Sequence, residues 1–285
     1  MSKPSNVAAL DPGLYFVATP LGNARDITLR ALDILRVAEV LAAEDTRTLR
    51  RLMEIHGVPL AGRRIVAYHD HSSEKDRGGL IAALTEGRSV AYASEAGTPL
   101  VADPGFALSR AAIEAGCSVI PVPGPSAALA ALTVSGLPSD RFMFAGFPPA
   151  AKGARRKFLE SLAGMPGTLI LYESPRRLGA TLAEACTALG DDRPAAVCRE
   201  LTKKFEEVRR GPLSDLAATY ADMPPKGEIV LCIGKGEVSH DPAEIEAALR
   251  DAMNTPHRKD AAREIADRFG VSRRDLYQLG LSFDP

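Results

Sequence analysis

The sequence predicts two α/β domains, a mostly parallel sheet followed by a mixed sheet, with a ligand cleft between them and a small all-helical C-terminal tail. Short apolar runs alternate with amphipathic stretches until about residue 235, which is typical of sheets covered by helices. The length of 285 residues suits about two domains. We predict an N-terminal domain at 1–123, a second α/β domain at 124–238 and the helical tail at 239–285.

The strands are predicted from short runs that contain β-branched or aromatic residues and are bounded by turn residues. In the first domain they are Leu14–Thr19, Glu39–Ala43, Arg64–Tyr68, Val90–Ser94 and Val119–Val122, with helices such as Leu29–Val37 and Arg47–Ile55 between them. In the second domain they are Phe142–Ala145, Thr168–Tyr172, Ala195–Arg199, Glu206–Arg210 and Glu228–Ile233. Several strands of the second series are separated by short turns, which favours a mixed sheet there.

Two Gly/Pro-rich segments interrupt the alternation of strands and helices. After the strand at 90–94, Gly97 is suited to a positive φ, and Asp103 and Pro104 are expected to cap and begin a helix. Such a loop can present backbone amides to a ligand at the edge of a sheet. The segment from Pro121 to Ser126 is the expected hinge between the domains, with Ser126 capping the next helix.

Composition limits the possible partners. Lys and Arg number 35 against 36 Asp and Glu, so any nucleic-acid surface must be a local patch. The apolar runs are too short to span a bilayer, and the first residues lack the layout of a signal peptide. The four cysteines are scattered without metal-binding spacing. We therefore expect a cytoplasmic protein with free thiols and no membrane partner.

Two polar loops follow strands of the first domain. Glu44-Asp45-Thr46-Arg47 is either a helix cap with an acid beside it or a group that orients a hydroxyl and holds a phosphate. His69-Asp70-His71 is either a surface turn or an acid/base pair at the cleft edge. Two imidazoles without a third ligand do not make a metal site, so no metal is expected.

Cationic segments are the candidates for contact with an anionic partner. Ser174 and Pro175 are expected to begin a helix with Arg176 and Arg177 in its first turn, where cations are unfavourable without an anion nearby. The run from Lys152 to Lys157 is either a solvated helix face or a phosphate-binding rim. In the tail, a Gly-turn and a Ser cap between amphipathic helices fit either a helix-turn-helix or a helical hairpin that packs on the protein.

The chain resembles the tetrapyrrole-methylase superfamily of S-adenosylmethionine enzymes. The resemblance is carried by ATPLGNARDITLRAL, AEDTR, SEAGTPLVADPG, PGPSA, GLPSDRFMFAGFPP and YESPRRL, which run in order over about residues 13 to 235. Within the superfamily it is similar to the branch that methylates the 2′-hydroxyl of a cytidine in small-subunit (16S) ribosomal RNA. One departure is Glu95, where the family usually has aspartate; the extra methylene moves this carboxylate by roughly a bond length but leaves the backbone loop intact.

This resemblance implies that S-adenosylmethionine binds in the cleft of a homodimeric methyltransferase. The positions that match the family's cofactor site are Pro20, Gly97, Thr98, Val101, Ser126, Ala127, Tyr172, Leu201, Lys226 and Gly227. A ribose hydroxyl needs positioning and a proton acceptor, for which the candidates are Asp45, Glu44 and His69. Ribosomal RNA, naked or in the assembled small subunit, is the implied substrate, and the residues expected to contact it are Arg47, Arg155, Lys157, Arg176, Arg273 and Arg274.

Two other functions fit parts of the sequence. A tetrapyrrole C-methyltransferase of the same fold would need a wide apolar trough and no basic tail. A nucleic-acid-binding regulator would use the tail and keep a vestigial ligand domain. The AEDTR loop and the Arg-rich tail favour the ribosomal RNA enzyme over the first alternative, and binding of S-adenosylmethionine would separate it from the second.

Overall fold

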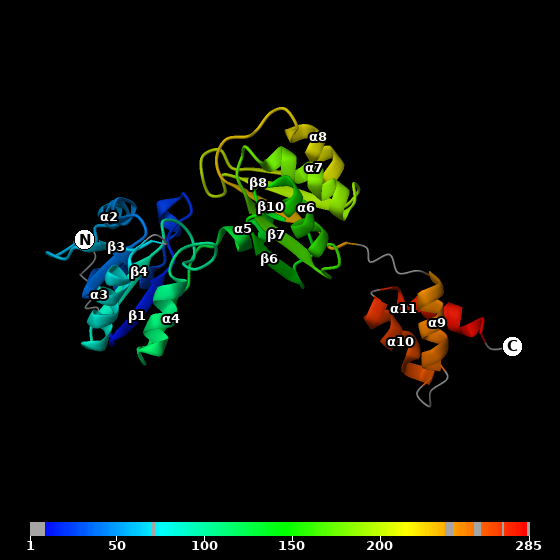
Figure 1. Cartoon of the computed structure of the whole chain (residues 1–285), viewed down its shortest axis with the longest axis horizontal. Helices are drawn as coiled ribbons and strands as arrows, with labels where there is room; N and C mark the ends of the chain where they lie inside the picture. Colours follow the sequence, from blue (N-terminus) through cyan, green and yellow to red (C-terminus); the bar gives the residue numbers. More distant parts are fainter. Residues whose placement is uncertain (1–8, 70–71, 237–241, 254–257, 270, 284–285) are drawn as a thin grey trace.

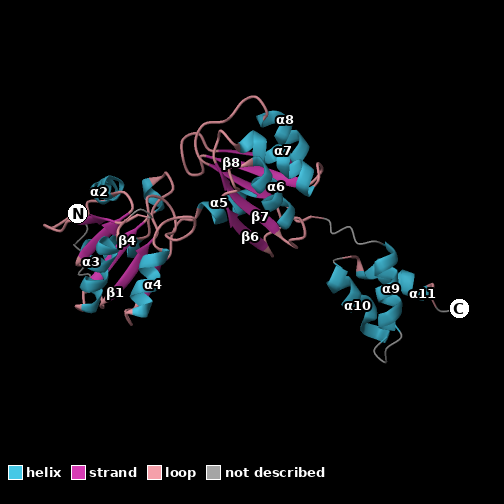
Figure 2. Cartoon of the chain, viewed as in Figure 1, coloured by secondary structure: helices cyan, strands magenta, loops and turns pink. Residues whose placement is uncertain are grey.

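The first domain is built on a five-stranded sheet in which every strand pair is parallel (Figures 1 and 2). The computed structural model describes residues 9–69, 72–236, 242–253, 258–269 and 271–283. The strand order is β3-β2-β4-β1-β5. The strands are β1 (Gly13–Val17), β2 (Val40–Ala43), β3 (Ile65–Ala67), β4 (Ser89–Ala93) and β5 (Val119–Val122). All five lie where the sequence predicts them.

Both faces of this sheet are covered. In β1, Tyr15 and Val17 join one apolar cluster while Leu14 and Phe16 join the other, as the alternation of a strand between two helical layers requires. The covering elements are the 3₁₀ turn η1 (Ala24–Asp26), α1 (Leu29–Val37), α2 (Thr46–Ile55), α3 (Glu74–Thr85) and α4 (Phe106–Glu114). The expected start of α4 at Pro104 is wrong, because Gly105 occupies the N-cap with φ +124° and the helix begins at Phe106.

The second domain has a mixed sheet of order β6-β7-β10-β8-β9. Its strands are β6 (Phe142–Gly146), β7 (Thr168–Glu173), β8 (Pro194–Arg199), β9 (Glu207–Pro212) and β10 (Ile229–Ile233). Only the β6–β7 pair is parallel; the other three pairs are antiparallel. Because β10 lies between β7 and β8, the last strand in the sequence occupies the centre of the sheet. The mixed sheet that the sequence predicts is confirmed.

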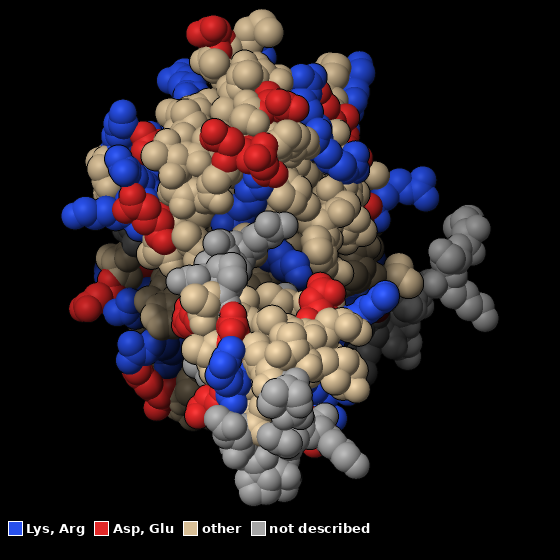
Figure 3. Space-filling model, turned by 90° about the vertical axis from the view of Figure 1, so that its right-hand side faces the viewer, with Lys and Arg blue, Asp and Glu red and all other residues tan. Residues whose placement is uncertain are grey.

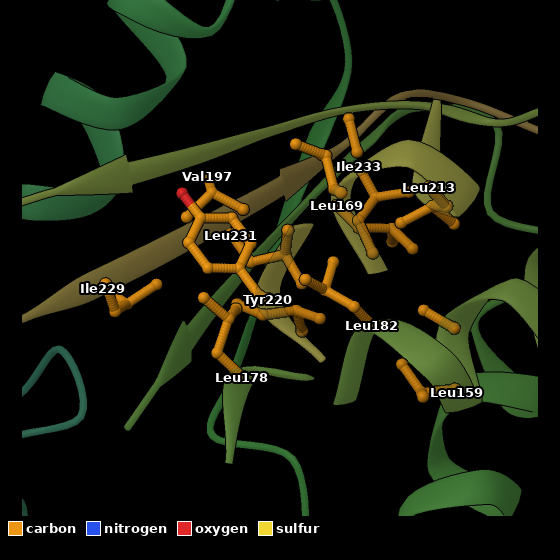
Figure 4. Packing of buried hydrophobic residues seen from close by; sticks show 14 of the residues in the cluster. Leu159, Leu169, Leu178, Leu182, Val197, Leu213, Tyr220, Ile229, Leu231 and Ile233 are labelled. Carbon is orange, nitrogen blue, oxygen red and sulfur yellow. The ribbon is translucent and has the colours of Figure 1, made fainter. Parts of the chain in front are cut away.

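Helices cover both faces of the second sheet. One face packs against α6 (Lys152–Ser161), α7 (Leu178–Leu189) and α8 (Leu213–Tyr220) through the leucine-rich cluster that Figure 4 shows around Leu231 and Tyr220. The other face packs against α5 (Ala127–Ser135), which directly follows the hinge. The chain therefore leaves the first sheet at β5 and joins the second domain through α5.

The tail is a bundle of three helices with its own apolar cluster. They are α9 (Pro242–Met253), α10 (Arg258–Phe269) and α11 (Arg273–Leu281), and Leu249, Ile265 and Leu276 lie among them with little exposure. Ser272 caps α11 by accepting a hydrogen bond from the Asp275 backbone, as the sequence predicts. The predicted break at 254–256 and the turn glycine at 270 lie outside the described residues. The boundaries after 123 and 238 stay a prediction.

The helices within the described ranges are too short or too polar to cross a membrane.

Candidate functional site

A pocket of about 660 Å³ lies between the two α/β domains. Its walls come from the loops after β1, β2 and β4, the start of α5, the loops after β6, β7 and β8, and the turn before β10. The volume is in the range of small-molecule and cofactor sites, and in an open α/β sheet such sites lie at the carboxyl ends of the strands.

One wall is a tightly bonded loop after β4. The backbones of Thr19 and Gly97 exchange two hydrogen bonds of 2.9 Å, and the Ser94 hydroxyl donates to the Gly97 carbonyl at 3.0 Å. Gly97 has φ +82°, and a Cβ built there would lie 3.2 Å from Cδ2 of Leu21. Glycine is therefore required at 97 both by backbone conformation and by limited space, which confirms its predicted positive φ.

The same loop is tied to the hinge. The Thr98 hydroxyl donates to the Pro125 carbonyl at 2.8 Å. Ser126 occupies the N-cap of α5, as predicted, but its side chain makes no capping hydrogen bond. Ser126 and Ala127 line the pocket instead, at the start of a helix whose first amides can bind an anionic group of a ligand.

Backbone strain is concentrated around the pocket. Across the described chain, five non-glycine residues have positive φ, and four of them lie in two pocket loops. These are Leu100 and Ala102 in the first domain and Glu200 and Thr202 in the second. Such conformations cost about 1–3 kcal/mol each and cluster at functional sites, because the surrounding structure must hold them.

The loop after β8 closes the pocket from the second domain. Nζ of Lys203 lies 3.1 Å from Oε1 of Glu200 and 2.9 Å from Oε1 of Glu228. The pKa of Glu200 is lowered, mainly because the Glu228 backbone N–H donates to its carboxylate and because Lys203 is near. Burial lowers the pKa of Lys203, but its bonds to Glu228 and Glu200 outweigh burial and raise it overall. Lys203 also packs so closely on Gly22 of the first domain that a Cβ at 22 would lie 2.3 Å from its Cγ.

A buried ion pair supports the wall after β7. The Glu173 carboxylate has no exposed side-chain surface and accepts bonds from Nε and Nη2 of Arg177 at 2.8 and 2.6 Å. It also accepts from the Ser174 backbone N–H and from the Thr181 hydroxyl. Neighbouring Tyr172 is partly buried, and burial raises the pKa of its phenol. The Ser174-Pro175 start predicted for the next helix is wrong, since these residues form a turn and α7 begins at Leu178.

The pocket lining is rich in carboxylates. Acidic side chains at five positions border it, namely Glu44, Glu95, Asp103, Glu173 and Glu228. Among the described residues that line it, the one Lys or Arg is Arg51 on α2. Helix α2 presents Thr48, Arg51, Leu52 and Ile55 to the pocket, a spacing that places all four on one helical face. Glu173 and Glu228 are already paired with Arg177 and Lys203, but the remaining acidic residues still outnumber Arg51, which favours a ligand that carries positive charge.

Nine of the ten positions predicted to bind the cofactor line this pocket. They are Pro20, Gly97, Thr98, Val101, Ser126, Ala127, Tyr172, Leu201 and Gly227. Lys226 is outside the lining, although its carbonyl accepts a bond from Nη1 of Arg199 at 3.2 Å next to the pocket turn. The structure thus gathers residues that are up to about two hundred positions apart in the sequence.

The three acid/base candidates have different positions. Glu44 lines the pocket, and its Oε2 accepts a bond from the Glu95 backbone at 3.2 Å. Asp45 is the N-cap of α2 and accepts from the backbones of Arg47 and Thr48, so the structure favours the helix-cap alternative for it. Its pKa is lowered mainly by its bond from the Arg47 side chain. His69 is exposed outside the pocket lining, in a turn in which its backbone bonds to Ser72. The other members of its motif, 70 and 71, lie outside the described residues.

Of the six residues predicted to contact RNA, five are exposed and one is buried. Arg47, Lys157, Arg176, Arg273 and Arg274 are exposed. Arg155 is only 6% exposed and donates from Nη1 to the Ala150 carbonyl at 3.0 Å, so its place on a phosphate-binding rim is wrong. On the face that carries the tail, cationic and anionic side chains are interspersed (Figure 3).

Arg51 and Phe147 are among the lining residues that sequence reasoning missed. Arg51 lies one helical turn after Arg47, and the spacing from the predicted loop could have identified it. Phe147 follows β6, and its sequence context, an aromatic residue before Pro148 and Pro149, does not predict a place in the pocket lining. No group of three or more potential metal ligands occurs within the part of the chain that the structure covers.

Comparison with known proteins assigns this fold and pocket to a class. The family model described as "Tetrapyrrole (Corrin/Porphyrin) Methylases" matches residues 13–217, and "RsmI C-terminal HTH domain" matches residues 239–283. The crystal structure of uroporphyrin-III-C-methyltransferase from Thermus thermophilus is 26% identical with a TM-score of 0.55, covering 79% of this chain and 94% of that one. The chain is therefore a methyltransferase of the tetrapyrrole-methylase fold.

Closer relatives define the branch. Ribosomal RNA small subunit methyltransferase I from Mesorhizobium japonicum is 51% identical over 94% of this chain and 91% of its own length. The protein of the same name from Synechocystis is 41% identical over 95% of this chain and 98% of its own length. The chain belongs to the ribosomal RNA small subunit methyltransferase I family.

Proposed function

We propose that this protein transfers a methyl group from S-adenosylmethionine to the ribose 2′-hydroxyl of a cytidine in 16S ribosomal RNA. The observation that carries the proposal is the interdomain pocket, whose lining includes five acidic residues, two of them paired with cations outside the lining, and one arginine. A carboxylate-rich pocket suits a cofactor with a sulfonium and an ammonium group. Apolar walls from Val101 and Leu201, together with backbone amides at the start of α5, suit an adenine ring and a carboxylate.

Bound S-adenosylmethionine supplies an electrophilic methyl group. The task left to this chain is to hold the 2′-hydroxyl in line with that methyl group and to accept the hydroxyl proton as the new oxygen–carbon bond forms. Glu44 is the candidate acceptor. The Glu95 backbone N–H fixes its carboxylate, and a carboxylate has about four acceptor sites, so one bond leaves room for a ligand hydroxyl.

RNA would be held outside the pocket by the exposed arginines and by the tail. Arg273 and Arg274 lie in the first turn of α11, at the position that contacts phosphates or bases in a helix-turn-helix. Removal of the tail from residue 240 onward should weaken RNA binding more than binding of S-adenosylmethionine. We also propose that the enzyme is a cytoplasmic homodimer, which light scattering of the purified chain tests for its oligomeric state.

The decisive experiment uses small subunits from cells that lack this enzyme. They are incubated with the purified protein and S-adenosylmethionine, and the RNA is digested to nucleosides for mass spectrometry. The expected product is one 2′-O-methylcytidine per subunit, and naked 16S RNA in parallel shows whether assembly is required. Glu44→Gln should bind S-adenosylmethionine but methylate slowly, since the amide cannot take up the proton. Methylation of a tetrapyrrole with none of ribose would contradict the proposal.

A further inference from the structure

Phe147 is an exposed aromatic side chain at the pocket. It follows β6, lines the pocket and is 54% exposed. The edge of one ring meets the face of the other between Phe147 and Tyr172, with ring centroids 5.5 Å apart at 69°. Tyr172 makes a second edge-to-face contact with Phe144, with ring centroids 4.8 Å apart. One part of the Phe147 ring is therefore packed against a partly buried support while much of its surface stays open.

The loop that carries Phe147 is fixed by two arginines. Nη1 of Arg177 donates to the Pro148 carbonyl at 3.2 Å, and Arg177 is itself held by the buried carboxylate of Glu173. Nη1 of Arg155, a nearly buried side chain, donates to the Ala150 carbonyl at 3.0 Å. Two prolines, at 148 and 149, further restrict the backbone. The exposed ring is thus presented on a rigid segment.

Such an arrangement is suited to stacking. The open part of the ring lies in the pocket lining, where a ligand in the pocket can cover it. Unstacked bases bind aromatic side chains in this way, and stacking accepts any base because each has a π face. Arg176 is exposed in the loop after β7, directly after the lining residues Ser174 and Pro175, and can meet a phosphate.

We propose that Phe147 is the platform on which the base of the target nucleotide stacks, so that its ribose 2′-hydroxyl faces the pocket. The inference rests on the proposed function and adds a substrate-binding residue to it. Val101 and Leu201 provide other apolar walls in the lining, which can take the adenine ring of the cofactor. Stacking on Phe147 would fix the nucleotide, while the Arg177 and Arg155 bonds keep the platform in place.

The test compares Phe147→Ala, Phe147→Leu and Phe147→Trp on small subunits that lack the modification. Alanine and leucine should lower kcat/KM by about 5- to 150-fold, the range that loss of one stacked base implies, while tryptophan keeps it. The Kd for S-adenosylmethionine, measured by calorimetry, should not change in any variant. Phe142→Ala is the matched control, because Phe142 is similarly exposed, at 45%, but lies at the other end of β6.

The outcomes distinguish failure of the proposed ribose methylation from failure of the stacking role of Phe147 alone. If the wild-type protein does not methylate ribose, the proposed function fails and the stacking role fails with it. If the wild type is active and Phe147→Leu keeps its kcat/KM, the stacking role alone is wrong. A parallel loss of S-adenosylmethionine affinity would assign the ring to the cofactor and also overturn the inference. The melting temperature should stay that of the wild type, since the side chain is half exposed.

Discussion

Replacement of Glu173 by alanine removes a carboxylate that is wholly shielded from solvent. In the native structure this group accepts bonds from Arg177, the Ser174 backbone and the Thr181 hydroxyl. Loss of one partner from a buried ion pair costs about 3–5 kcal/mol, because the remaining charge loses its partner. The Arg177 side chain is 28% exposed and can regain part of its hydration, so the free energy of unfolding should fall by about 3 kcal/mol, at the lower end.

A second ion pair in the same domain gives a matched control. Arg156 and Glu160 are also four residues apart and bond at 2.8 Å, but the Glu160 side chain is 46% exposed. Exposed pairs of this kind contribute about 0.3–0.5 kcal/mol, so Glu160→Ala should be nearly neutral. The chain has no tryptophan, so urea unfolding is followed by circular dichroism. If Glu173→Ala cost no more than Glu160→Ala, burial would not set the strength of this pair and our reasoning would be refuted.

Three further predictions concern the pocket. Gly97→Ala, at φ +82°, should destabilise the protein by about 1–2 kcal/mol and weaken S-adenosylmethionine binding; unchanged melting and affinity would contradict this. Because the folded pKa of Glu200 lies below its ordinary 4.5, its stabilisation is present above pH 4.5 and lost as the pH falls through the lowered value. Glu200→Gln should therefore flatten the acid side of the stability profile, and a curve as steep as that of the wild type would speak against stabilisation of this carboxylate by the Glu228 backbone N–H and Lys203. Arg176→Ala, in the exposed loop beside the pocket, should lower the salt dependence of RNA binding by about one unit of slope, while Arg110→Ala on α4 should leave it unchanged.

The strands were predictable because each is a short apolar run between turn residues. Val90 to Ala93 is an example: it is buried on both faces of the parallel sheet, and a continuous apolar segment is what such a position demands. Helix starts were less predictable. Ser174 and Pro175 have the composition of a helix N-terminus, but the bond from Ser174 to Glu173 and the following turn delay α7 to Leu178.

The pocket itself was largely predictable from loops, while side-chain roles were not. Thr19 and Gly97 could be placed together because strands β1 and β4 end at the same edge. The sequence does not reveal which face of α6 is buried, so Arg155 was predicted to contact RNA although it is buried and bonds to the Ala150 carbonyl. Phe147 could not be predicted at all, since its exposure depends on packing against Tyr172 from another strand.

The position of β10 has a consequence for folding during synthesis. The first sheet is complete once β5 has been made, because that strand is added at an edge, and the domain can form while the rest of the chain is being translated. In the second sheet, β7 and β8 are joined through β10, which ends at Ile233. Until β10 emerges from the ribosome, both strands have an open edge that can pair with another chain. The half of the protein that carries Tyr172 and Phe147 is therefore the half that keeps unpaired strand edges until the end of β10 has been made.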